Sequence, residues 1–415
     1  MDKKVNKSQM NEVLHYFLFD PNIYISAILT LKRKSELSTE FSIKKIKEAV
    51  ELAYTKNETT MSKLVLEHGE IYFENMPKTG CKVFIDHRNW IDILHENEKN
   101  TFRVNEGEFV RTFIIDGKEE VRVFIMAHHI LGDGHSLVLL AQDILNCLVG
   151  EDVEYKTLNN DDEEPIPLDV KFPFLKKLGI KLLNSQWKKT GKEFTWDDYF
   201  NIHNKFWENR QTYVEKTTIG EEKLLHIKER SRKIGITINS YIIAKQMEKT
   251  PEYEFIGVPV SYRGRNRSLG NKVTIIRIRY KYNKEISFEE NAKEIHEIIK
   301  GTIEDPSKKF FIAKSLGLFG YGLLDGALMA KYAGYKNEIA EKVIYIIGMS
   351  GANKTQLGVT NLGKLNLKTE YDAFQLKEFE ALAASMSTTK DVISICTLEN
   401  RMNLCFSRVK KMKNS

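Results

Sequence analysis

The stretch AHHILGDGHS gathers three of the chain's ten histidines, His128, His129 and His135, around one aspartate, Asp133. An imidazole has an ordinary pKa of about 6.5, so a histidine here could take a proton from an alcohol, an amine or a thiol near neutral pH. Imidazole and carboxylate groups are also metal ligands. The residue types therefore allow a general base, a metal site, or histidines that only close a turn through hydrogen bonds.

The spacing of these residues weighs against the metal site. Neighbouring side chains on a strand point to opposite sides, so His128 and His129 cannot easily bind one ion, and no HExxH pattern is present. Asp133 cannot lie beside His129 along a strand. Gly132 and Gly134 would give a loop around the aspartate its backbone freedom.

The flanking segments predict that this stretch joins a strand to a helix. VRVFIMA, residues 121–127, reads as a strand that pairs with FVRTFII, residues 109–115, through a turn at Asp116-Gly117. LVLLAQDILNCLVG, residues 137–150, reads as a helix that stops at Gly150. Loops between rigid elements often carry function, because the elements fix the position of the loop residues.

The remaining pattern is that of a mixed α/β protein. We expect residues 315–334 to form a buried helical segment rich in small residues rather than a membrane span. We also expect a helix that begins at Ser287, which can form a capping box with Glu290. A hairpin is predicted around His68-Gly69 and another at the C-terminal end, with its turn at Asn400-Arg401. Further strands are predicted at 25–34, 253–262, 272–282, 343–349 and 357–365, and a further helix at 42–54.

Length and composition restrict the class of protein. A chain of 415 residues predicts two domains or two large subdomains, and a hydrophobic fraction of 42% predicts a well-buried core. The net charge of +6 is small for this length and gives no sign of the concentrated basic face of a nucleic-acid-binding protein. The four cysteines, Cys81, Cys147, Cys396 and Cys405, show no CxxC spacing. Together with the absence of a secretory leader pattern, this favours a reduced, cytoplasmic protein with buried thiols.

Two adjoining segments near the middle of the chain differ from the rest. Residues 151–170 are acidic, polar and proline-containing, which is typical of an exposed linker between residues 1–160 and residues 161–415. Residues 171–192 are basic and amphipathic. They predict either a helix that binds a membrane surface or a partner, or a helix packed on the second half with its lysines in solvent.

HHILGDG, residues 128–134, matches the HHxxxDG signature of the CoA-dependent acyltransferase superfamily at all four fixed positions. That superfamily includes chloramphenicol acetyltransferase-like enzymes, condensation domains of nonribosomal peptide synthetases, alcohol O-acetyltransferases, and wax-ester and polyketide-associated acyltransferases. VPVSYRGRNRSLGNKV, VTNLGKL and ISICTLENRMNLCFS resemble later segments of the family and follow in the family's order. The plant-type DFGWG motif is absent, which argues against the plant branch of the family. No carrier-protein or adenylation segment is attached in this sequence, so the chain most resembles the stand-alone bacterial alcohol O-acetyltransferases or polyketide-associated acyltransferases.

The resemblance implies an α/β (α+β) fold of two chloramphenicol acetyltransferase-like subdomains, each a mixed β-sheet flanked by helices, with the active site in a tunnel between them. His129 would be the general base, whereas His128 would be packed or hydrogen-bonded. Asp133 would be structural and would pair with Arg263 of the second half, with Arg265 as the alternative partner.

The resemblance also implies roles for five residues outside the His129, Asp133 and Arg263 set. Gly134 would permit the tight turn into the helix. Thr360 and Asn361 could donate hydrogen bonds to the oxyanion, although Asn361 could equally cap a strand-end turn. Arg265 and Arg267 would be either solvated turn residues or contacts for the phosphates of CoA.

The implied activity is transfer of an acyl group from an acyl-CoA or an acyl carrier protein to a small alcohol or amine. The thioester of CoA or phosphopantetheine would be a co-substrate, with no permanently bound cofactor and no metal, and the protein would act as a monomer. Two alternatives remain: a free-standing condensation enzyme that joins carrier-bound substrates, and a non-catalytic relative that only binds a ligand.

Overall fold

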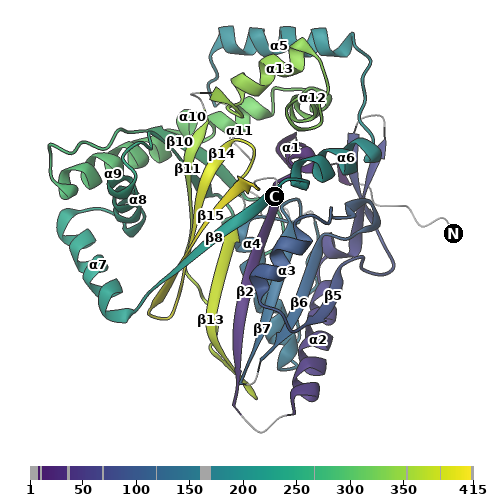
Figure 1. Ribbon diagram of the computed structural model, residues 1–415, viewed down its shortest axis with the longest axis vertical. Coiled ribbons are helices and arrows are strands. Elements are labelled where there is room, and N and C mark those ends of the chain that lie inside the picture. The colour runs from purple at the N-terminus through teal and green to yellow at the C-terminus, as the bar shows by residue number, and fades with distance from the viewer. Residues whose placement is uncertain are drawn as a thin grey trace.

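The computed structural model describes residues 8–9, 12–34, 38–67, 70–117, 119–158, 170–265, 267–351, 354–383 and 385–412. The expected linker at 151–170 and the turn at residues 68–69 therefore lie largely or wholly outside the described residues. The described chain forms two six-stranded mixed sheets, a small three-stranded sheet and surrounding helices (Figure 1). This is the mixed α/β architecture that the sequence predicts, with helices flanking both large sheets.

The first large sheet carries the HHILGDG segment at the end of one of its central strands. Its order is β12-β13-β2-β7-β6-β5, and all neighbours are antiparallel except β5 and β6. Helices α2 (Thr39–Thr55) and α4 (Gly134–Leu148) pack together on this sheet. The strands are β2 (Tyr24–Arg33), β5 (Lys82–Asp86), β6 (Val110–Asp116), β7 (Glu120–His128), β12 (Glu370–Tyr371) and β13 (Phe374–Ala383).

The second large sheet has the order β10-β9-β11-β14-β15-β8, and β11 runs parallel to both of its neighbours. Helices α7 (Glu221–Ile234), α8 (Ile238–Lys249) and α9 (Phe288–Glu304) cover it and enclose a separate apolar core. Its strands are β8 (Arg210–Ile219), β9 (Phe255–Ser261), β10 (Val273–Arg279), β11 (Thr355–Lys364), β14 (Thr389–Leu398) and β15 (Arg401–Lys411).

Strand β13 connects the two large sheets. It comes from the C-terminal part of the chain, yet it pairs with β2 along nearly its whole length (Figure 1). Its Phe379 carbonyl also accepts a hydrogen bond from Asn403 Nδ2 of β15, at 2.9 Å. The division expected at residue 160 stays a prediction, and the two sheets do not follow that division strand for strand.

A layer of helices lies at one end of the two sheets (Figure 1). Helix α1 (Glu12–Phe19) contacts α6 (Trp196–Trp207), α11 (Phe311–Leu316) and α12 (Tyr321–Tyr332). α13 (Glu338–Ile346) contacts both α12 and α5 (Phe174–Lys188). The small sheet is formed by β1 (Ser8–Gln9), β4 (Glu70–Asn75) and β3 (Ser62–Glu67), in that order. The remaining described elements are two α-helices, α3 (Trp90–Asn97) and α10 (Pro306–Lys309), and two short 3-10 helices, η1 (Thr59–Met61) and η2 (Val104–Glu106).

The strand predicted at 343–349 is wrong, because this apolar run belongs largely to helix α13. The Asn337 side chain accepts hydrogen bonds from the backbone N–H groups of Ile339 and Ala340, which begins a helix. Ala340, Val343 and Ile344 are then buried at helical spacing. The run VIYII has no polar residue that would distinguish the spacing of a helix from the alternation of a strand. Its helical spacing shows only when the preceding residues are included.

Other local predictions are confirmed with small shifts. Ser287 and Glu290 form the expected capping box of α9. The C-terminal hairpin is present, but Leu398 pairs with Arg401, so its turn is Glu399-Asn400 rather than Asn400-Arg401. Glu399 has a φ of +51°, as a two-residue hairpin turn requires.

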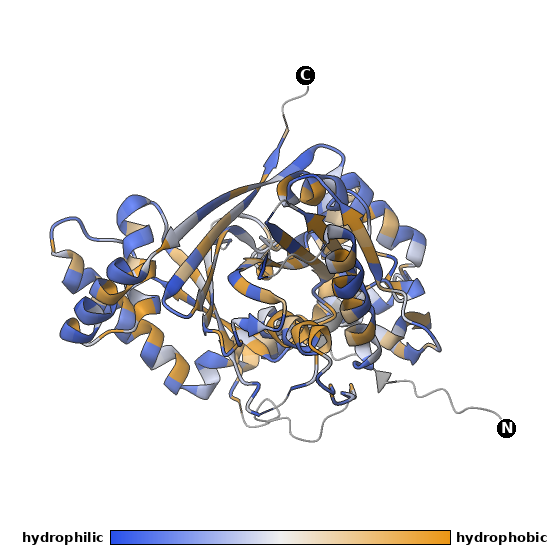
Figure 2. Ribbon diagram, turned by 90° about the horizontal axis from the view of Figure 1, so that it is seen from below, coloured by the Kyte–Doolittle hydropathy of each residue, from blue (hydrophilic) through white to orange (hydrophobic). Residues whose placement is uncertain are grey.

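The helices alternate between hydrophobic and hydrophilic residues along their length, as expected when one side of a helix faces a sheet (Figure 2). All four cysteines are free, and Cys147, Cys396 and Cys405 are buried. Among the described residues, no helix combines the length and the apolar character needed to cross a membrane.

Candidate active site

The loop from His129 to Asp133 joins strand β7 to helix α4, as the sequence predicts. The His129 backbone N–H donates to the Ile23 carbonyl at 2.8 Å, at the start of β2. The His129 carbonyl accepts a hydrogen bond from Asn271 Nδ2 at 2.6 Å, just before β10. The backbone of His129 is therefore held by residues next to both large sheets.

The His129 imidazole is partly exposed and lies against Phe17, with 4.8 Å between ring centroids. Nδ1 is buried and has no hydrogen-bond partner among the described residues, so we expect a substrate to meet the ring at Nε2. Burial lowers the pKa of His129 below its ordinary value, and the nearby Asp133 and Asn271 only partly offset this effect. The ring is consequently neutral at pH 7 and can accept a proton.

Asp133 does not serve as a partner of His129. Its carboxylate accepts hydrogen bonds from the Ser136 backbone at 3.0 Å and from the Lys272 backbone at 2.9 Å, so it caps α4 and binds the second half. Burial alone would raise the pKa of Asp133, but Arg263 and these two backbone N–H groups outweigh it and lower the pKa. The carboxylate is thus charged, and both of its oxygens already accept hydrogen bonds.

The ion pair expected between Asp133 and Arg263 is present, with 2.9 Å between Asp133 Oδ1 and Arg263 Nη2. Both side chains are buried. The guanidinium also donates from Nη1 to the Ser268 carbonyl at 2.6 Å, and from Nη2 to the Gly270 carbonyl at 2.6 Å and to Ser136 Oγ at 2.8 Å. The planar group with several fixed donors suits this set of acceptors, which a lysine could not satisfy together.

Two residues of this network are missing from the sequence prediction. Ser136 donates from Oγ to the Gly270 carbonyl at 2.9 Å. Asn271 donates from Nδ2 to the His129 carbonyl at 2.6 Å. A serine at the third position of a helix and an asparagine after a glycine are common local signals, so neither residue points to a partner more than a hundred positions away.

The structure gives Gly132 and Gly134 different roles from the predicted one, in which Gly134 permits a tight turn into the helix. Gly134 is already helical and its φ is not positive, so the turn does not depend on its backbone freedom. A side chain there would instead meet Leu362, 2.8 Å from its Cδ2 atom. At Gly132, an added Cβ would overlap Ser136 Oγ and would lie 2.8 Å from the Gly270 nitrogen. Gly132 is therefore the glycine that allows the close approach of the two halves.

His128 points into different surroundings from His129. It is buried next to Phe102 and His203, with ring centroids 5.9 Å and 6.5 Å away, and its Nδ1 accepts the Ile130 backbone N–H at 3.2 Å. Burial, followed by the neighbouring His203 and His129, keeps its pKa well below the ordinary value. His135 is partly exposed at the start of α4, and burial lowers its pKa too. In the described part of the chain, no three His, Cys, Asp or Glu side chains are placed to hold a metal ion.

Thr360 and Asn361 lie on β11 and are partly exposed. The Asn361 side-chain oxygen accepts the Gly363 backbone N–H at 2.8 Å, which is the turn-capping role that the sequence allows. The next residue, Leu362, lies against Gly134, so the end of β11 does reach the motif. Contact of either residue with an oxyanion stays a prediction.

The two arginines that follow Arg263 in the same loop are exposed. Arg267 donates to Gln142 Oε1 of α4 at 2.7 Å. Arg265 has neither an ion pair nor a side-chain hydrogen bond with the described residues. Arg263 rather than Arg265 is therefore the partner of Asp133, and binding of phosphate groups by Arg265 and Arg267 stays a prediction.

A buried polar cluster around Asp20, just before Ile23 in the chain, has no counterpart in the sequence prediction. Asp20 accepts hydrogen bonds from the Ser387 backbone and side chain, each at 2.9 Å, and from the Asn22 backbone at 3.1 Å. Burial raises the pKa of Asp20. Lys331 of α12 donates to the Ser387 carbonyl at 3.3 Å, and burial lowers its pKa to about 8. The cluster fixes the turn that leads to Ile23, whose carbonyl holds His129.

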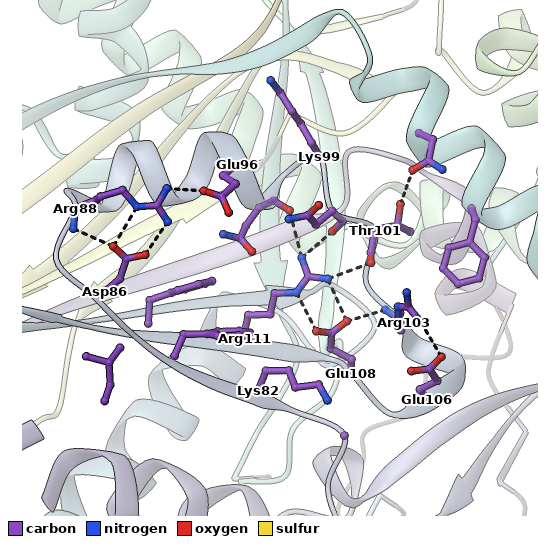
Figure 3. Close-up of a pocket in the computed structure, with 18 residues that line it drawn as sticks. Lys82, Asp86, Arg88, Glu96, Lys99, Thr101, Arg103, Glu106, Glu108 and Arg111 are labelled. Carbon is purple, nitrogen blue, oxygen red and sulfur yellow. Dashed lines mark hydrogen bonds and ion pairs between the residues drawn. The ribbon is translucent and has the colours of Figure 1, made fainter. Parts of the chain in front are cut away.

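A surface pocket of about 820 Å³ opens on the first half of the chain (Figure 3). Its walls carry Arg111 and Glu108, 3.1 Å apart, and the exposed Arg88, which forms ion pairs with the partly buried Asp86 and with Glu96. His129 does not line this pocket. The tunnel expected between the two halves therefore stays a prediction.

No family model and no curated protein matches the sequence. The structure, in contrast, resembles solved structures along almost its whole length. A trichothecene 15-O-acetyltransferase from Fusarium sporotrichioides has a TM-score of 0.62 at 10% sequence identity, and the match covers 97% of this chain and 90% of that one.

Two other solved structures match as fully. The first condensation domain of the calcium-dependent antibiotic synthetase, in complex with a substrate analogue, has a TM-score of 0.61 at 12% identity and covers 97% and 91% of the two chains. A wax ester synthase/diacylglycerol acyltransferase from Marinobacter aquaeolei VT8 has a TM-score of 0.55 at 10% identity and covers 97% and 93%. The chain thus has the condensation-domain and acyltransferase fold that its motif predicts.

Proposed function

We propose that the protein is an acyltransferase that moves an acyl group from a CoA or carrier-protein thioester to an alcohol or amine. The observation that carries the proposal is the state of His129. Its ring is neutral and partly exposed, and its backbone is held from both halves by Ile23 and Asn271. The shared fold with an O-acetyltransferase, a wax ester synthase and a condensation domain supports the reaction class.

The proposed reaction needs no acyl-enzyme. His129 Nε2 takes the proton of the acceptor hydroxyl or amine while the acceptor oxygen or nitrogen attacks the thioester carbonyl carbon. The resulting tetrahedral oxyanion collapses, the carbon–sulfur bond breaks, and the imidazolium returns the proton to the leaving thiolate. The products are an ester or amide and a free thiol. Asp133 and Arg263 position the loop and exchange no proton.

A thiol-release assay tests the reaction. The purified chain is incubated with acyl-CoAs of increasing length and a panel of alcohols and amines, with product identity checked by mass spectrometry. The same acyl groups are then offered on a carrier protein. We expect release of thiol that depends on the acceptor, with at least one of the two donor types. If neither donor gives acceptor-dependent release, the acyltransferase assignment is wrong.

The variant His129→Ala tests the base. We expect turnover to fall by about a hundredfold or more, with an unchanged circular dichroism spectrum. The matched control is His226→Ala, because His226 is exposed on α7, and we expect this variant to keep wild-type turnover. Wild-type turnover in His129→Ala would show that the reaction does not use this base.

A further inference from the structure

Helix α5 (Phe174–Lys188) carries an apolar face that no described part of the protein covers. Phe174 is 75% exposed, Leu175 79%, Leu178 54% and Leu182 59%. These four side chains follow helical spacing, so at about 100° per residue they form one continuous stripe about 100° wide. We call this stripe the outer face of α5. Helix α5 itself lies at the end of the molecule formed by the helical layer (Figure 1).

The opposite face of α5 already holds the helix on the protein. Ile180 and Trp187 are buried, and they lie about 180° around the helix from the outer face. The Trp187 ring fits against Gly322 and Gly326 of α12, where an added Cβ on Gly326 would lie 2.5 Å from the ring. A helix that packs on a globular protein needs one apolar side. A second, exposed apolar side is the kind of contiguous patch that marks an interaction site.

The charge of this segment identifies the chemistry of that surface. Residues 171–192 contain seven lysines and no aspartate or glutamate. Lys177, Lys181 and Lys188 are exposed along one border of the outer face, and none of them forms an ion pair with a described residue. They lie about 90° from the middle of the stripe. Lysines at this angle can extend toward negative charge while the apolar stripe is buried.

We propose that the outer face of α5 binds the surface of an anionic lipid bilayer. The helix would lie parallel to the bilayer, with Phe174, Leu175, Leu178 and Leu182 among the acyl chains and the flanking lysines at the phosphate level. An amphipathic helix of this composition gains from apolar burial and from attraction to anionic headgroups together.

The neighbouring helix α13 carries two further exposed apolar side chains. α13 contacts α5, and its Tyr345 and Ile346 are also exposed. The helices beneath connect the region to the candidate active site, because α12 holds Trp187 and also packs against α1, which carries Phe17. Phe17 lies against the His129 ring. A bilayer bound at α5 would therefore contact the same helical layer that borders His129.

Vesicle co-sedimentation tests this proposal without any assay of activity. The full chain is mixed with vesicles of phosphatidylcholine alone, or of phosphatidylcholine with about 30 mol% phosphatidylglycerol, at low and high salt. We expect binding to the anionic vesicles and a clear loss of binding at high salt, because salt screens the lysines. Absence of binding to anionic vesicles, or equal binding to both kinds, would overturn the proposal.

Two sets of variants locate the binding to α5. The combined variant Leu175→Ser, Leu178→Ser, Leu182→Ser and the combined variant Lys177→Gln, Lys181→Gln, Lys188→Gln should each weaken binding by about tenfold or more. The matched control is Leu52→Ser with Leu225→Ser, which changes exposed leucines on α2 and α7. The control should bind like the wild type, and all variants should keep the wild-type unfolding temperature because the changed positions are exposed.

Sedimentation velocity distinguishes the competing occupants of the outer face. If the wild type is a dimer that the leucine variant converts to a monomer, a second copy of the chain covers the face and the lipid proposal is wrong. If only an acyl carrier protein, and no vesicle, binds in a manner that the lysine variant abolishes, the face is a protein-docking site and the proposal is likewise wrong. A monomer that binds anionic vesicles through these residues supports it.

Discussion

Arg263 Nη2 lies 2.9 Å from Asp133 Oδ1, although the two residues are 130 positions apart in the chain. Asp133 caps helix α4 on the first sheet, and Arg263 follows strand β9 of the second sheet. This ion pair is therefore a direct link between the two halves at the base of the loop that carries His129. Its geometry explains why the aspartate of the motif is not a relay partner of the histidine.

Removing one member of this pair should destabilise the protein strongly. In Arg263→Ala, the Asp133 charge stays buried without its main partner, and we expect a loss of about 3–5 kcal/mol in the free energy of unfolding. Urea unfolding followed by circular dichroism measures this loss. The control is Arg279→Ala, whose ion pair with Glu254 is exposed and should contribute less than about 1 kcal/mol. A double-mutant cycle with Asp133→Ala that gives no coupling energy would contradict the link.

The two motif glycines should respond differently to alanine. In Gly132→Ala, the new Cβ would overlap Ser136 Oγ and approach the backbone nitrogen of Gly270, so the halves must move apart at the loop. In Gly134→Ala, the neighbour is the flexible end of the Leu362 side chain, which can shift. We expect at least about a tenfold greater loss of turnover in Gly132→Ala. Equal losses would show that the approach at Gly132 does not set the loop position.

The rate of the proposed reaction should fall on the acid side of the pH profile. Burial lowers the pKa of His129, so the base stays neutral down to a pH below its ordinary value of about 6.5. We expect kcat/KM to be flat at neutral pH and to fall tenfold per unit below the folded pKa of His129. An acid limb centred above pH 7 would contradict this assignment, because it would require a raised pKa.

Stability should also fall in acid because of the buried imidazoles. Burial lowers the pKa of His203 to about 4, below the unfolded value of about 6.5, so the unfolded state binds the extra proton first. The contribution of His203 is complete above about pH 6.5 and is lost as the pH falls toward 4, by up to roughly 3 kcal/mol.

The difference in unfolding free energy between the wild type and His203→Gln isolates this effect, because the contributions of the other titrating groups are the same in both proteins and cancel in the difference. We expect the difference to change by about 1.4 kcal/mol per pH unit between pH 6 and pH 4. A difference that stays constant over this range would mean that His203 titrates alike in the folded and unfolded chains.

The local structure around His129 follows from the sequence because its signals are close together. An apolar strand, two glycines, an aspartate and an amphipathic helix fall within about 30 residues, and the structure places β7 and α4 there. The partner of Asp133 was predicted only through the family resemblance. The apolar run at 343–349, taken alone, fits the spacing of a helix and the alternation of a strand equally well, which is why the strand prediction was wrong.

Contacts between distant segments could not be predicted in the same way. Ser136 and Asn271 look like ordinary helix-start and turn residues, and their functional contacts reach across to the other half. The pairing of β13 with β2 joins segments about 350 residues apart, and neither strand carries a local signal for it. The outer face of α5, in contrast, was visible as an amphipathic segment, but only the structure shows which side of the helix the protein itself covers.

The pairing of β13 with β2 also has a consequence for translation, because one edge of β2 stays unpaired until β13 has been synthesised. The first eight residues of β2 are buried in the finished protein, where β13 and β7 lie on either side of it. During translation, β2 can pair with β7 early, but its other edge stays open until Phe374–Ala383 has left the ribosome. For most of its synthesis the nascent chain thus presents an unpaired apolar strand edge, and premature termination would release the chain in that association-prone state.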